Sequence, residues 1–343
     1  MKRNTIFKII SILIGTFLSL VLAEVVYRVY HFANYADMKD IRAGTRKPVV
    51  SPDREHKLGE IIQLSVHRDI IYELIPSSKY RFQNVLVETN TAGFKDREYP
   101  SAKQPKTVRI IGLGDSVMFG WGVPESDCYL TKLEAALNQS GEIPFEVINT
   151  AVPGYNTVME VATLEQKMDL GTVDMVIINF VGNDLDLPNF IRKKPAYFGT
   201  KKSFILQRFE ENDGMDRDLS EAPFNETYTG YLRDPDKVPA EYRDLVGEQA
   251  YIRAMSRLKE LQGKYGFKVI VLSSNPMDAA PSFVLETCEK LGFEMVKVMP
   301  YWAKYKDANS DAIWQLSKAD GHPSIVGHAV IAEALKEKIM AMF

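Results

Sequence analysis

From residue 107 to the C-terminus, short apolar runs alternate with segments that have helical periodicity. The runs contain almost no polar residues, which is typical of strands that are covered on both faces. Parallel neighbours need long crossover connections, and the helical segments would supply them. The pattern therefore predicts an α/β fold, a three-layer α/β/α sandwich around a parallel sheet of about five strands. The expected strands are 107–112, 145–151, 173–181, 268–273 and 293–298. The expected helices are 129–137, 158–170, 251–265, 283–291 and 325–342.

The N-terminus begins with a basic segment and continues into an uncharged one. Three basic residues lie among the first eight, and the apolar run 9–23 that follows contains no charge. This run is long enough to cross a bilayer only if Glu24 lies at the far interface, because a span takes about 17–25 residues. We predict a transmembrane anchor at 1–35, with its basic end in the cytoplasm and the rest of the chain outside. A cleaved signal peptide stays open as the alternative.

The rest of the chain divides into a lead-in and a main domain. The lead-in spans 36–106, and its segment 80–88 alternates like a strand before a turn at 90–93, which predicts a small hairpin packed on the main domain. The main domain spans 107–343. A charged, aromatic insertion at 185–246 interrupts it after the third strand, where α/β proteins carry ligand loops. This insertion is either a surface excursion or a lid that forms a substrate wall.

Charge and cysteine content exclude several classes of protein. The chain has 42 Lys and Arg residues against 45 Asp and Glu, a formal net charge of −3 at pH 7, so it lacks the basic excess that a nucleic-acid partner requires. Two cysteines cannot build a disulfide framework or a four-cysteine zinc site. His31, His56 and His67 lack the spacing of a metal site, and no phosphate-binding glycine–lysine motif occurs. We therefore expect neither a metal nor a cofactor.

The first expected strand ends in the most informative motif of the chain. The segment 112–116 reads Gly-Leu-Gly-Asp-Ser, which places Ser116 at the carboxyl edge of the sheet and at the start of a helix. Backbone N–H groups at a helix N-terminus can stabilise a developing oxyanion. A dinucleotide fingerprint or a nucleophile elbow would need glycine where the chain has Val117 or Met118. Taken alone, Ser116 could also be a helix N-cap.

Three further motifs follow in order at the ends of expected elements. The second strand ends with Asn-Thr-Ala-Val-Pro-Gly at 149–154, the third ends with Val-Gly-Asn-Asp at 181–184, and Asp-Gly-His-Pro-Ser at 320–324 precedes the last helix. Together with the first motif, these segments resemble the SGNH/GDSL hydrolase family over about residues 107–343. The resemblance implies a flavodoxin-like sandwich with a five-stranded parallel sheet, and a serine hydrolase that acts on carboxylic esters without a cofactor.

The resemblance also implies roles for four residues. Ser116 matches the nucleophile, and its N–H matches one oxyanion donor. Gly154 and Asn183 match the two other donors, and His322 matches the general base. These roles are chemically consistent, because a serine hydroxyl is a poor nucleophile until a base takes its proton, and neutral histidine can do so near neutral pH. Asn183 as part of a turn and His322 as a loop residue are the alternatives.

One position departs from the pattern of the family. The aspartate that orients the histidine commonly stands three residues before it, where this chain has Ala319. Asp320 stands two residues before His322, a spacing that resembles polysaccharide O-acetyltransferase relatives. Either Asp320 orients His322, or the site works as a dyad with a backbone carbonyl orienting the ring. We favour Asp320.

The motifs and the N-terminal segment together predict a single-pass, membrane-anchored serine esterase whose catalytic domain lies in the periplasm or at the cell surface. It would remove O-acyl groups, with O-acetyl favoured, from a cell-envelope glycan, glycolipid or lipid through an acyl-serine intermediate. An O-acyltransferase that uses the same site is the close alternative, with envelope polysaccharide machinery as a candidate partner. A catalytically idle module that binds polysaccharide or a partner is the third, because fold alone assigns no function.

Overall fold

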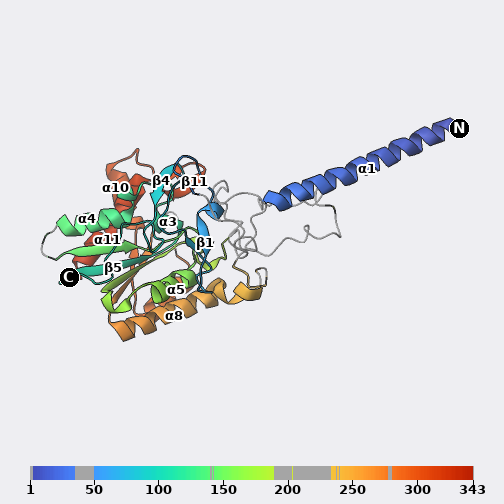
Figure 1. Cartoon of the computed structure of the whole chain (residues 1–343). Helices are drawn as coiled ribbons and strands as arrows, with labels where there is room; N and C mark the ends of the chain where they lie inside the picture. Colours follow the sequence, from blue (N-terminus) through green and yellow to red (C-terminus); the bar gives the residue numbers. More distant parts are fainter. Residues whose placement is uncertain are drawn as a thin grey trace. The chain divides into compact units, whose positions relative to one another are not determined.

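We describe the protein from a computed structural model, shown in Figure 1, over residues 3–34, 50–139, 141, 143–188, 203, 233–236, 238, 240–276 and 280–342. Residues 36–49 of the expected lead-in, and most of the expected insertion at 185–246, lie outside these described residues. Contacts divide the chain into two compact units, Met1–Arg46 with Lys193–Arg217, and Lys47–Arg192 with Asp218–Phe343. The strands of the described chain all belong to the second unit. The domain boundaries expected from the sequence stay predictions.

The first unit contains a long helix, α1, at Arg3–Asn34. Its segment Phe7–Tyr27 has 21 residues and a mean hydropathy of 2.5, and none of it is buried. At 1.5 Å per residue, such a segment spans about 30 Å, the thickness of the hydrocarbon core of a bilayer. Among the described residues this is the one helix long and apolar enough to cross a membrane, and an anchor or a signal sequence would each have this character.

The second unit is built on a five-stranded parallel sheet. Its strands are β5 at Val108–Leu113, β6 at Phe145–Asn149, β7 at Met175–Phe180, β8 at Lys268–Ser273 and β9 at Glu294–Lys297. Their order across the sheet is β6-β5-β7-β8-β9, which confirms the predicted parallel α/β fold. The chain runs from β5 to the edge strand β6 and then returns past β5 to β7. Ligands of open α/β sheets bind outside the carboxyl ends of the strands where the order reverses in this way.

Helices cover both faces of the sheet and complete three layers (Figure 1). Helices α5 and α8, with α9 beside α8, lie on one face, and α4 and α11 lie on the other. Their bounds are α4 Tyr129–Gln139, α5 Thr157–Lys167, α8 Gly247–Tyr265, α9 Ser282–Leu291 and α11 Ile325–Met340.

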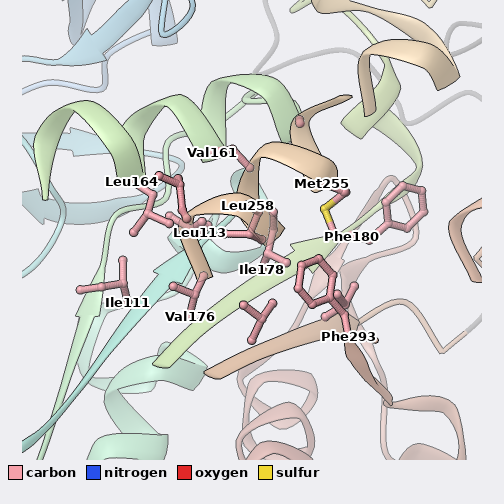
Figure 2. Packing of buried hydrophobic residues seen from close by; sticks show 14 of the residues in the cluster. Ile111, Leu113, Val161, Leu164, Val176, Ile178, Phe180, Met255, Leu258 and Phe293 are labelled. Atoms are coloured by element: carbon pink, nitrogen blue, oxygen red, sulfur yellow. The ribbon is translucent and has the colours of Figure 1, made fainter. Parts of the chain in front are cut away.

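The core between the sheet and the helices α5 and α8 is formed by aliphatic and aromatic side chains (Figure 2). Val176, Ile178 and Phe180 alternate along β7 and belong to this core, together with Leu164 of α5 and Leu258 of α8. Burying one such side chain contributes about 1.5–3 kcal/mol relative to leaving it in water. The residues between them on β7 are also buried, on the opposite face, which explains why the run contains so few polar residues.

Two small antiparallel hairpins precede the sheet in the sequence. Their strands are β1 Ile62–Leu64, β2 Tyr72–Leu74, β3 Lys79–Phe82 and β4 Val85–Glu88. The segment expected to alternate at 80–88 is therefore two strands, because Gln83 and Asn84 form a turn with φ of 54° and 63°. Positive φ at both central residues is what a two-residue type I′ turn requires.

A third hairpin and several short elements were not expected from the sequence. Strands β10 and β11 pair antiparallel just before α11, and helix α10 precedes them. These strands have three and four residues and no apolar run, so they carry little periodic signal. The remaining bounds are β10 Gln315–Ser317, β11 Asp320–Pro323, α10 Met299–Ala308, α3 Ser116–Phe119, and the 3-10 segments η1 Leu58–Glu60, η2 Glu125–Asp127, η3 Leu170–Thr172, η4 Gly182–Leu185 and η8 Ala240–Leu245.

Candidate active site

Ser116 lies on the tight connection between β5 and α3. Asp115 is the N-cap of α3, and its Oδ1 accepts a hydrogen bond from the N–H of Val117 at 2.9 Å. The helix ends after one turn at Gly120, whose φ is 77° and where a Cβ would lie 2.2 Å from the Sγ of Cys128. Glycine is therefore required to turn the chain away so soon after the serine. The result is a serine at the carboxyl edge of the strand where the sheet order reverses.

His322 reaches this serine from the β10–β11 hairpin. Its Nε2 lies 2.8 Å from the Oγ of Ser116, and its Nδ1 lies 2.7 Å from Oδ1 of Asp320. Because a carboxylate can only accept, Nδ1 carries the proton and Nε2 is left to accept from the serine. Asp320 and His322 are two residues apart on a strand, so their side chains share one face. The Asp-x-His spacing therefore suits a histidine presented by a strand.

Trp121 contacts both Asp320 and His322. Its ring stacks on the imidazole of His322 at 4.8 Å between centroids and 11° between planes, and its Nε1 donates to Oδ2 of Asp320 at 3.2 Å. Phe82 of the second hairpin packs edge-on against the indole at 4.9 Å. Burial by itself raises the pKa of Asp320, but the hydrogen bonds and charge of His322, with the indole N–H, lower it below its usual range.

Asp115 links the serine to Asn183. Its Oδ2 accepts from the Oγ of Ser116 at 3.2 Å and from the side-chain amide of Asn183 at 3.1 Å. Burial raises the pKa of Asp115, against the opposing effects of the Val117 N–H, the His322 charge, Asn183 and Ser116. The serine hydroxyl therefore has two acceptors, and the shorter contact is the one to His322.

Gly154 lies on the loop that follows β6, and this loop is tied to the serine turn. Val152 stands two residues before Gly154, and its N–H donates to the carbonyl of Gly114 at 3.2 Å. Gly154 has a φ of 82°, and a Cβ there would lie 2.9 Å from the hydroxyl of Tyr72. Within the described chain, the N–H groups of Ser116 and Gly154 donate to no protein acceptor, so both are available to a ligand.

The loop after α3 is supported by Lys95, a buried residue of the lead-in for which the sequence predicted no role. Its side chain is 1% exposed, and its Nζ donates to the carbonyls of Phe119, Gly120 and Val123 at 3.0–3.2 Å. Burial lowers the pKa of Lys95, and the nearby Cys128 thiol opposes this effect. Three carbonyl acceptors satisfy the three donors of an ammonium group. The lysine thereby fixes the loop that carries Trp121.

The site residues named from the sequence thus fall into two groups. Ser116, His322 and Asp320 form one chain of hydrogen bonds, and Asn183 joins the serine through Asp115. Gly154 lies on the neighbouring loop, and its place beside the reacting atoms stays a prediction. In the described part of the chain, no group of three or more His, Cys, Asp or Glu side chains could hold a metal ion.

Comparisons with known proteins give distant structural similarity only. No family model matches the chain, and no curated protein matches it. An alpha/beta hydrolase enzyme from the metagenome of Lake Arreo, Spain, is 16% identical with a TM-score of 0.41, over 71% of this chain and 99% of that one. A lipase/acylhydrolase from Enterococcus faecalis is 15% identical with a TM-score of 0.40, over 68% and 96%. An acetyl xylan esterase is 11% identical with a TM-score of 0.42, over 68% and 100%. Similarity this low assigns no activity, so the function must be argued from the residues of this chain.

Proposed function

We propose that this chain is a serine esterase of the SGNH/GDSL type. The observation that carries the proposal is the chain of hydrogen bonds from Ser116 through His322 to Asp320, at 2.8 and 2.7 Å. A serine hydroxyl that donates to an imidazole oriented by a carboxylate is the arrangement that activates serine for acyl transfer. A helix N-cap or a loop histidine would not require these three side chains to meet.

The reaction proceeds through an acyl-serine. The Oγ of Ser116 bonds to the ester carbonyl carbon while its proton passes to Nε2 of His322. The oxyanion accepts from the N–H groups of Ser116 and Gly154 and from the amide of Asn183. The alcohol then leaves with the proton from His322. Water attacks the acyl group, again giving its proton to His322, and the free acid leaves as the serine recovers its proton.

The proposed substrates are O-acyl groups, with O-acetyl favoured, on a cell-envelope glycan, glycolipid or lipid. Helix α1 supports a place at the membrane, and the three basic residues among the first eight favour a cytoplasmic N-terminus with the catalytic domain outside. An O-acyltransferase is the second candidate, favoured by the two-residue spacing of Asp320 and His322. It predicts that an acceptor glycan gains acetyl mass only when Ser116 is present.

The test is covalent labelling of the full-length chain in detergent with a fluorophosphonate, read by intact mass. We expect one adduct on the wild type, none on Ser116→Ala, and an unchanged adduct on Ser101→Ala. Ser101 is a matched control because it is exposed and lies outside the site. A folded wild type that takes no label, or an adduct that persists in Ser116→Ala, would contradict the proposal.

A further inference from the structure

Two buried carboxyl groups lie behind the active site and take no part in the proposed reaction. Glu160 on α5 is 1% exposed and Asp184 on η4 is 2% exposed. Both oxygens of Glu160, and Oδ1 of Asp184, have no hydrogen-bond partner among the described residues. A buried carboxylate without partners is strongly disfavoured in a folded protein, so this pair needs a physical account.

One hydrogen bond brings Asp184 of η4 to the first turn of α5, the helix that carries Glu160. Oδ2 of Asp184 accepts from the hydroxyl of Thr157 at 3.1 Å. Thr157 and Glu160 are three residues apart on α5, so they lie on one face of the helix. The carboxyl group of Asp184, which accepts from Thr157, therefore lies near the side chain of Glu160. The negative charge of Glu160 accordingly raises the pKa of Asp184, in addition to the larger effect of burial.

Among the described residues, no cationic side chain acts on the charge of this pair. The titratable groups whose electrostatic influence reaches it are Asp115 on the serine turn, Tyr129 on α4 and Tyr251 on α8. None of these side chains can supply a positive charge. Burial, and then the charge of Asp115, also raise the pKa of Glu160. Burial and like charge therefore both act against the state in which the two carboxyl groups are ionised together.

The pair links η4, which carries Asn183, to α5, which begins shortly after the loop of Gly154. Asp184 follows Asn183 directly on η4, and α5 begins three residues after Gly154. Asn156 caps the start of α5, and its amide donates to the carbonyls of Asp186 and Leu245. Repulsion between Glu160 and Asp184 would therefore move η4, and Asn183 with it, away from α5.

We propose that Glu160 and Asp184 share one proton, and that this proton holds η4 on α5 with Asn183 in position for the reaction. They are positioning residues, since neither touches the reacting atoms. The effect on catalysis rests on the proposed esterase activity, whereas the shared proton does not.

The proposal fixes how stability and activity change with pH. The folded pair keeps a proton that the unfolded chain loses at about pH 4, so stability falls as the pH rises above that value until the folded pair also loses the proton. The same loss would separate η4 from α5, and kcat would fall on the alkaline side. The alkaline limb of the pH profile of kcat would then be set by this pair and not by His322.

The test is Glu160→Gln in the full-length chain, with Glu165→Gln as the matched control. Gln keeps the shape of the side chain, needs no proton to be neutral and can donate to Asp184. Glu165 lies on the same helix, but it pairs with Arg257 and is not buried. We expect Glu160→Gln to remove most of the fall in Tm between about pH 6 and about pH 9, and to move the alkaline limb of kcat up by about one pH unit or more. The control should follow the wild type in both measurements.

Each outcome separates the parts of the proposal. A Tm profile of Glu160→Gln that parallels the wild type would overturn the shared proton. If the Tm profile of Glu160→Gln is flattened but the wild type has no esterase activity, the shared proton stands and the proposed function fails. An active wild type whose alkaline limb does not move in Glu160→Gln would overturn the positioning role. If this variant does not fold, the infrared carbonyl band of a protonated carboxyl group must still occur in the wild type near neutral pH, and its absence would overturn the proposal.

Discussion

His322 is held on three sides before any substrate arrives. Ser116 lies at one ring nitrogen, Asp320 lies at the other, and the indole of Trp121 covers one face. Asp320 is fixed in turn, because one oxygen accepts from the ring and the backbone N–H of His322 and the other accepts from Trp121. A site in which each reacting group has a packed partner needs little reorganisation during the reaction.

The indole N–H contributes separately from the stacked ring, which predicts the behaviour of Trp121→Phe. The variant keeps an aromatic ring but leaves Oδ2 of Asp320 without its donor, so we expect kcat/KM to fall about tenfold. Because the lost donor stabilises the ionised form, the pKa of Asp320 rises and the acidic limb of the pH profile moves to higher pH. Asp320→Ala should lose more than about a hundredfold. The measurement is kcat/KM against pH on a soluble acetyl ester.

The control for this prediction is Trp302→Phe on α10, which removes an indole N–H far along the chain from the serine turn. It should leave the pH profile unchanged. An acidic limb that stays in place in Trp121→Phe would show that the indole N–H does not influence Asp320. Asp320→Ala with turnover within about threefold of the wild type would instead favour the dyad.

The sequence indicated some of these residues and could not indicate others. Ser116, His322 and Asp320 stand in short motifs at the ends of expected elements, so the motifs alone suggested them. Trp121 meets Asp320 across 199 positions of sequence, and no local pattern encodes that contact. Lys95 was missed for the same reason, because a buried lysine looks in the sequence like any exposed one.

At the scale of elements, the apolar runs were the reliable signal. Strands covered on both faces cannot be confused with surface loops, and β8 falls on the expected residues 268–273. The hairpin of β10 and β11, which presents His322, was missed because a strand of four residues that includes glycine and proline has no usable periodicity. The element that carries His322 therefore had the weakest signal in the sequence.

The loop after β6 is shaped by the lead-in, which predicts a strong effect of Gly154→Ala. Alanine at this position would have to keep a strained φ of 82°. Its methyl group would lie 2.9 Å from the hydroxyl of Tyr72. The loop must shift to relieve this, and an oxyanion donor would move with it, so we expect kcat to fall about a hundredfold and Tm by a few degrees. The measurements are steady-state kinetics and thermal unfolding of the full-length chain.

Tyr72→Phe in the Gly154→Ala background is the matched test of that cause. It removes the hydroxyl that the methyl group would meet, but it also removes a bond of 2.7 Å to the carbonyl of Pro153 and leaves the strained φ. A partial recovery of kcat is therefore expected, without recovery of Tm. A Gly154→Ala variant with the wild-type rate would remove Gly154 from the oxyanion site.

At the scale of the whole molecule, residues 50–106 of the lead-in belong to the same compact unit as the sheet. Asp96 of the lead-in accepts from the N–H of Asn149 at the end of β6, and Tyr72 lies beneath Gly154. Phe82 packs on Trp121. From the sequence we expected this lead-in to form a small hairpin packed on the main domain, but its support of the candidate site was not predicted. The folding of the site and of the lead-in should consequently be a single transition.

The buried acids predict how the stability of that unit depends on pH. Asp186 is 6% exposed, and burial raises its pKa to about 7 even though Arg233 pairs with it at 3.0 Å and opposes the effect. Burial likewise raises the pKa of Asp96 to about 6. Unfolding restores a pKa of about 3.9, so the folded state holds protons that the unfolded chain releases. Stability therefore falls as the pH rises from about 4 to about 7, by up to about 1.4 kcal/mol per pH unit for each group.

Asp186→Asn isolates one of these groups, because the amide needs no proton to be neutral. Below about pH 4 the variant should be no more stable than the wild type, since both then carry a neutral side chain beside Arg233. As the pH rises toward about 7, the wild type loses the contribution of Asp186 in addition to those of the other buried acids, so the difference in Tm should grow in favour of the variant by several degrees. Thermal unfolding at stepped pH measures this, with Asp307→Asn on the exposed face of α10 as the control. Parallel curves for Asp186→Asn and the wild type would mean that Asp186 stays ionised when buried, with Arg233 stabilising its charge more than burial disfavours it.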